Sequence, residues 1–93
     1  MAARFGIGIY EKKDYAEILR LCEDSLSMDD TWEEWRQSMK KSVKNFREIG
    51  IKTVEITVKP KELVDFCRAR GLTINSQTRS NFIAHKVKEL HED

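Results

Sequence analysis

The sequence predicts a small α+β domain in which about four helices pack on a minimal sheet. Three observations support this prediction: a capped amphipathic helical pattern within residues 28–50, an alternating strand pattern within residues 51–58, and helical patterns on both sides of them. The chain has 93 residues, of which 40% are hydrophobic and 35% are charged, as is ordinary for a soluble globular domain. We therefore expect a single domain over residues 1–93.

The helix within residues 28–50 is predicted by its cap, its periodicity and its end. Thr31 and Glu34 have the Thr-x-x-Glu spacing of a capping box, in which each side chain accepts a hydrogen bond from the other residue's amide. Gly50 then supplies the left-handed conformation that ends many helices. The apolar residues between them recur at the helical period: Trp32, Trp35, Met39, Val43, Phe46 and Ile49.

The strand within residues 51–58 alternates between apolar and polar side chains, which is typical of a sheet covered on one side only. Its backbone groups need a partner. Either residues 5–10 pair with it, although Gly6 and Gly8 lower their strand propensity, or a second copy of the chain completes the sheet in a homodimer. The first alternative is favoured, and both stay open. The two faces of the strand would carry Val54, Ile56 and Val58 on one side and Thr53, Glu55 and Thr57 on the other.

Three further helices are predicted from the same periodicity. The first covers residues 13–26, the second begins at Pro60 and ends at Gly71, and the third begins at Asn75 or Ser76. Their expected buried residues are Tyr15, Ile18, Leu19, Cys22 and Leu26 in the first, Leu63, Phe66 and Cys67 in the second, and Phe82, Ile83, Val87 and Leu90 in the third.

The net charge of +1 hides an uneven distribution. Residues 1–35 carry 4 Lys/Arg and 9 Asp/Glu, a net charge of −5, whereas residues 36–93 carry 13 and 7, a net charge of +6. We see no internal repeat, and no apolar run near the roughly 20 residues that a membrane span needs. Cys22 and Cys67 lie on predicted buried faces, which indicates reduced thiols in a cytoplasmic protein and leaves a disulfide between them open.

Motifs for catalysis or metal binding are missing from the sequence. His85 and His91 are six residues apart, which is not a same-face spacing on a helix, and no Cys-x-x-Cys pair occurs. We therefore expect no metal, no cofactor, no catalytic residue and no enzyme activity.

Two features remain as candidates for binding. Trp32 and Trp35 share one helical turn, so they either anchor the helix in the core or expose an edge as interface anchors, since tryptophan is enriched at interface hot spots. The second feature is the basic C-terminal half, where a helix, a turn and a helix superficially suggest DNA or RNA binding. Its candidate contacts are Arg68, Arg70, Arg79 and Lys86.

Five short segments of core and cap residues occur between residues 10 and 88. They are Tyr15-Ala-Glu-Ile-Leu, Thr31-Trp-Glu-Glu-Trp, Gly50 followed by Val54, Phe66-Cys67-Arg68-Ala-Arg-Gly71-Leu72, and Arg79 near Phe82. Together they resemble a family of small bacterial proteins with no known activity. The resemblance implies a bacterial cytoplasmic setting and assigns no functional residue.

From these observations we predict a non-enzymatic module that binds another protein, with Trp32 and Trp35 at its interface. Association with nucleic acid through the basic C-terminal helices is the alternative prediction.

Overall fold

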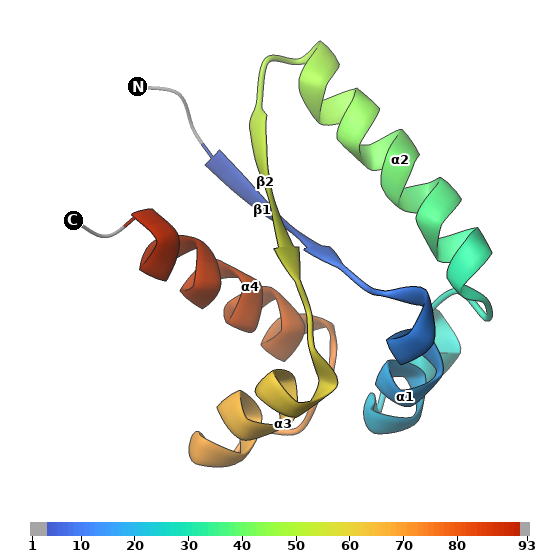
Figure 1. The fold of residues 1–93 in the computed structure, drawn as a ribbon, viewed down its shortest axis with the longest axis vertical. Helices are drawn as coiled ribbons and strands as arrows, with labels where there is room; N and C mark the ends of the chain where they lie inside the picture. The colour runs from blue at the N-terminus through green and yellow to red at the C-terminus, as the bar shows by residue number, and fades with distance from the viewer. Residues whose placement is uncertain (1–3, 92–93) are drawn as a thin grey trace.

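Two strands lie between four helices in the computed structural model, which describes residues 4–91 (Figure 1). The strands form a two-stranded parallel sheet, in which Arg4 pairs with Lys52 and Ile9 with Thr57. The predicted α+β class is therefore confirmed. The element order is β1 (Arg4–Ile9), α1 (Lys12–Leu21), the 3₁₀ turn η1 (Ser25–Ser27), α2 (Trp32–Glu48), β2 (Lys52–Thr57), α3 (Pro60–Ala69) and α4 (Ser76–His91).

The local signals of the sequence set the helix ends. The Thr31 hydroxyl accepts a hydrogen bond from the Glu34 amide at 3.1 Å, as the capping box predicts. Gly50 and Gly71 follow α2 and α3 with φ angles of +81° and +65°, which a residue with a Cβ adopts only with strain. These caps confirm the predicted start of α2 and the predicted stops of both helices.

The partner of β2 is β1, so the sheet needs no second chain to pair these two strands. The glycines that weaken β1 as a strand also let α4 approach it closely. A Cβ on Gly6 would lie 2.6 Å from Val87 Cγ2, and a Cβ on Gly8 would lie 2.6 Å from Ile83 Cδ1. Close packing against α4 thus compensates for the low strand propensity of glycine. The strand propensities of residues 5–10 alone do not predict this compensation.

Helices lie on both faces of the sheet. Gly6 and Gly8 face α4, whereas the Phe5 ring points to the other face and lies 4.9 Å from the Phe46 ring of α2. Figure 1 shows α2 and α4 diverging on either side of the strands. The prediction of a sheet covered on one side only is therefore wrong, because α2 lies over the polar face as well, although Glu55 on that face remains exposed.

The hydrophobic core lies beyond the carboxyl ends of the two strands, between α1, α3 and the first two turns of α4, and the start of α2 packs against it. Away from this end the packing is sparse, and no residue of α2, all of which is described, is fully buried. Leu26 and Leu90, both predicted to be buried, are 102% and 64% exposed, because α1 ends before Leu26 and α4 extends past the core. The buried core residues are Tyr10, Tyr15, Ile18, Cys22, Val58, Leu63, Cys67 and Phe82.

The structure also reveals an internal repeat that we did not see in the sequence. Each half is a strand followed by a short and a long helix, of 6, 10 and 17 residues in the first half and 6, 10 and 16 in the second. Residues 13–20 (KDYAEILR) and 61–68 (KELVDFCR) match in charge or apolar character at every position. An ion pair joins Glu11, which precedes α1, to Lys59, which precedes α3. The two halves are therefore similar units that share one sheet.

Candidate functional site

Trp32 and Trp35, the predicted interface residues, fasten the start of α2 to the core. The Trp32 indole donates a hydrogen bond to the Tyr10 carbonyl at 2.7 Å, and the Trp35 ring lies 5.0 Å from the Tyr10 ring. Both tryptophans are half-buried and pack against the core. Each tryptophan therefore anchors the helix to the core and keeps part of its surface exposed, and the interface role stays a prediction.

Arg79 lies in the interior and connects the two halves of the chain. Its side chain is 12% exposed and forms two hydrogen bonds with the Asp24 carboxylate, at 2.8 and 3.2 Å. It also donates to the Cys22 sulfur at 3.1 Å. The guanidinium lowers the pKa of Asp24, and the Ser76 amide adds a hydrogen bond to the same carboxylate. Burial alone would lower the pKa of Arg79, but its contact with Asp24 outweighs this effect and the pKa is raised.

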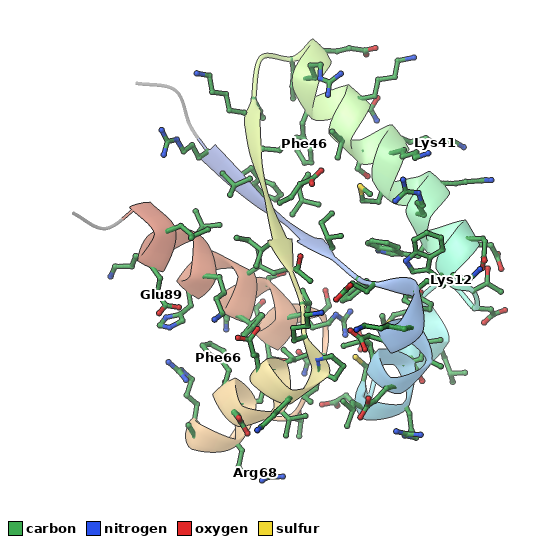
Figure 2. All side chains as sticks on the ribbon, viewed as in Figure 1. Lys12, Lys41, Phe46, Phe66, Arg68 and Glu89 are labelled. Atoms are coloured by element: carbon green, nitrogen blue, oxygen red, sulfur yellow. The ribbon has the colours of Figure 1, made fainter. Side chains whose placement is uncertain are left out.

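The other predicted nucleic-acid contacts are dispersed over α3 and α4. Arg70 lies over the Phe66 ring, 3.8 Å from its centroid, and Lys86 Nζ lies 3.5 Å from the Glu62 carboxylate. Arg68 points away from α4 at the far side of α3 (Figure 2). With Arg79 held in the interior, the four predicted residues do not form one basic face.

Both cysteines are buried free thiols. They line one pocket beside α1 and α3, which brings Cys22 and Cys67 into the same neighbourhood. Burial raises the pKa of Cys22, although Arg79 acts in the opposite direction. A raised thiol pKa disfavours the thiolate, so the thiol of Cys22 is a poor nucleophile.

A groove with a volume of about 750 Å³ lies between α2 and α4 along β1. Successive residues of a strand point to opposite faces, so a groove lined by Phe5, Gly6, Ile7 and Gly8 in turn must run along an edge of the strand. No described residue of β2 lines it, so this is the edge of β1 that faces away from β2.

Apolar side chains from both helices form the walls of this β1 groove. Figure 2 shows Phe46 directed from α2 toward the strands, whereas Lys41 is directed away from them. Arg4 is the one charged side chain among the described residues of the lining. The lining consists of Arg4, Phe5, Gly6, Ile7 and Gly8 of β1, Trp35, Ser38, Met39, Ser42 and Phe46 of α2, and Ser80, Asn81, Ile83, Ala84 and Val87 of α4.

Sequence reasoning identified one residue of this groove, Trp35. The alternation of apolar side chains in residues 5–10 and the apolar stripe of α2 were visible in the sequence. Their juxtaposition with α4 was not, because it depends on the parallel pairing of two strands that lie 48 residues apart (Arg4 with Lys52).

Among the described side chains, those of residues 4–90, no three His, Cys, Asp or Glu residues gather closely enough to hold a metal ion. No helix of the same residues is long and apolar enough to cross a membrane.

No protein-family model, no curated protein and no solved structure matches the chain. The resemblance to small bacterial proteins therefore stays a prediction.

Proposed function

We propose that this protein is a non-enzymatic interaction module that binds a neutral, extended segment of a partner protein in the β1 groove. One observation carries the proposal: the edge of β1 that faces away from β2 lies open inside a groove walled by helices on both faces of the sheet. An open strand edge presents unpaired N–H and C=O groups, which an added strand satisfies by main-chain hydrogen bonds.

The lining of the groove sets the chemistry of the bound segment. Alternate side chains of an added strand would point toward α2, against Met39 and Phe46, and toward α4, against Ile83 and Val87. Since the lining is almost uncharged, a segment with apolar residues on both faces fits it better than a charged one. Main-chain hydrogen bonds would supply affinity, and the two apolar walls would supply selectivity.

The tryptophans have a place in this proposal. Trp35 lines the groove directly, whereas Trp32 holds the start of α2 through its hydrogen bond to the Tyr10 carbonyl. Because α2 is held in place, the groove is formed before a ligand binds. Less conformational entropy is then lost on binding. The predicted protein interface is thus extended from two tryptophans to the whole β1 groove.

The alternative prediction, nucleic-acid association through the basic C-terminal helices, has less support. Arg79 forms an ion pair with Asp24, and Lys86 forms one with Glu62. Phosphate contacts need several exposed cations along one surface, and these residues do not share one.

The test selects peptides from a random display library on the immobilised protein and measures their affinity for two variants. Ser42→Arg places a long charged side chain in the groove from an exposed position of α2, so it should abolish binding. Gln37→Arg adds the same charge to an exposed position of α2 outside the groove and serves as the matched control. We expect selected peptides to be uncharged and apolar on both faces.

Two results would overturn the proposal. One is a set of peptides that bind Ser42→Arg and the wild-type protein equally well. The other is self-association of the wild-type protein in analytical ultracentrifugation that Ser42→Arg abolishes, since a second copy of the chain would then occupy the groove.

A further inference from the structure

A second groove, basic in character, lies on the opposite flank of α2. Its volume is about 360 Å³, and the lining side chains of the sheet are Ile9 and Glu55. A shallow pocket at the end of α2 continues it toward Lys52 and shares Arg47 with it. The α2 residues that line the basic groove are Arg36, Met39, Lys40, Val43, Lys44 and Arg47.

Four of these residues are cations that recur along one flank of the helix, at Arg36, Lys40, Lys44 and Arg47. Spacings of four, four and three residues keep side chains on one side of an α-helix. Among the described residues, none of the four has a carboxylate within 4.0 Å, in contrast to Lys86 of α4. Their charges are therefore available to a ligand.

The net charge of the lining is strongly positive for so small a surface. Four cations and the single carboxylate of Glu55 give 4 − 1 = +3. The β1 groove on the other flank of the same helix has Arg4 as its one charged described residue. The two flanks of α2 therefore suit ligands of different charge.

We infer that the basic groove binds an acidic segment of a partner protein in extended conformation. Residues four apart in a helix are separated by about 6 Å along its axis, and alternate residues of an extended chain by about 6.6 Å. Acidic side chains at every second position can thus meet Arg36, Lys40 and Lys44 in succession.

A peptide suits this groove better than a nucleic acid. Proteins that bind single strands usually stack the bases on exposed aromatic side chains. No described aromatic residue lines the basic groove, and the Arg36 guanidinium lies over the Trp32 ring, 5.3 Å from its centroid.

This inference goes beyond the proposed function, because it concerns a different ligand on the other flank of α2. The test titrates isotopically labelled protein at low salt with an octaglutamate peptide blocked at both ends. A glutamine–serine peptide of the same length is the neutral control, and an oligothymidylate of the same charge is the nucleic-acid control. The readout is the dissociation constant together with the residues whose amide resonances shift.

Lys44→Glu and Lys41→Glu form the matched pair of variants. Both reverse one lysine of α2, but Lys44 lines the groove and Lys41 points away from the sheet. We expect octaglutamate to shift amides of residues 36–47 and 52–57, and Lys44→Glu to weaken its binding at least about fivefold, with Lys41→Glu within about twofold of wild type.

Three results would overturn the inference: no binding of octaglutamate at low salt, equal weakening by both variants, or tighter binding of the oligothymidylate through the same residues. Ser42→Arg, which blocks the β1 groove, should leave octaglutamate binding intact, so the two proposals fail separately.

Discussion

Replacing Arg79 by methionine should remove the main polar link between the two halves of the chain. Arg79 of α4 donates two hydrogen bonds to Asp24, which follows α1, and the ion pair is largely shielded from solvent at side-chain exposures of 12% and 24%. Methionine keeps much of the side-chain volume and removes the charge. The variant therefore leaves the Asp24 carboxylate without its cation, while the Ser76 amide remains bonded to it.

The loss of unfolding free energy at pH 7 should be about 3 kcal/mol. A hydrogen bond to a charged group contributes about 1.5–3 kcal/mol, and removing one partner of a fully buried ion pair costs about 3–5 kcal/mol. Asp24 keeps some contact with water, which places the cost at the lower end of that range. A domain of this size has roughly 5–15 kcal/mol of stability, so the variant should fold but unfold at much lower urea concentration.

The pH dependence distinguishes this ion pair from simple packing. Arg79 lowers the folded-state pKa of Asp24, so the pair stabilises the fold above the unfolded-state pKa, near 3.9. That contribution is lost as the pH falls through the folded-state pKa. The difference between wild type and Arg79→Met should therefore be largest near neutral pH and shrink in acid.

Urea unfolding followed by tryptophan fluorescence measures this difference at several pH values. Lys86→Met is the matched control, since Lys86 lies on the same helix and pairs with Glu62 at 3.5 Å on the surface, which should be worth about 0–1 kcal/mol. Asp24→Asn tests the same pair from the other side. The reasoning is refuted if Arg79→Met costs no more than Lys86→Met, or if its cost is the same at every pH.

Further predictions concern close packing, a shifted phenol and the extent of the core. Gly6→Ala should cost about 1–3 kcal/mol in urea unfolding, because its Cβ meets branched methyls near the α4 backbone, and Gly8→Ala should cost less, because its closest contact is the movable Cδ1 end of Ile83; costs near zero for both would argue against close packing of β1 on α4. Burial, with the nearby charge of Asp29, raises the pKa of Tyr15 to about 12, so an absorbance titration should show a phenol that ionises near pH 12 and disappears in Tyr15→Phe. Leu26→Ser should change the unfolding free energy by less than about 0.5 kcal/mol, because Leu26 is exposed, whereas Ile18→Ala should cost about 2–5 kcal/mol, because Ile18 is buried. Similar values for the two variants would mean that the core extends beyond α1.

Signals that act within a few residues were predicted from the sequence. The capping pair Thr31 and Glu34, the stops at Gly50 and Gly71, and the alternation that marks β2 each depend on local backbone geometry. These signals determine which elements form and where they end. They were sufficient for the α+β class and for the number of helices.

Features that depend on distant residues were not predicted. Leu26 fits the apolar period of α1 but lies beyond its end, because the chain turns away at Cys22. Arg79 reads as a surface cation in a polar segment, and only its contact with Asp24, 55 residues earlier, places it inside. The β1 groove likewise requires β1, α2 and α4 to meet, which no local pattern encodes.

The charge asymmetry of the sequence has two counterparts in the structure. Part of it is cancelled within the fold, where Arg79 pairs with Asp24 and Lys59 pairs with Glu11. Four of the 13 Lys and Arg residues within residues 36–93 line one flank of α2. The cations proposed to bind an acidic ligand therefore lie in α2. They are not the residues predicted from the C-terminal helices.

The measurement that tests the central claim most directly is a resonance-shift map of isotopically labelled protein with a peptide selected by display. The account predicts shifts in the amides of residues 4–8, with nuclear Overhauser contacts between the peptide backbone and β1 that Ser42→Arg removes. Shifts confined to other surfaces, with the amides of residues 4–8 unchanged at saturation, would contradict it.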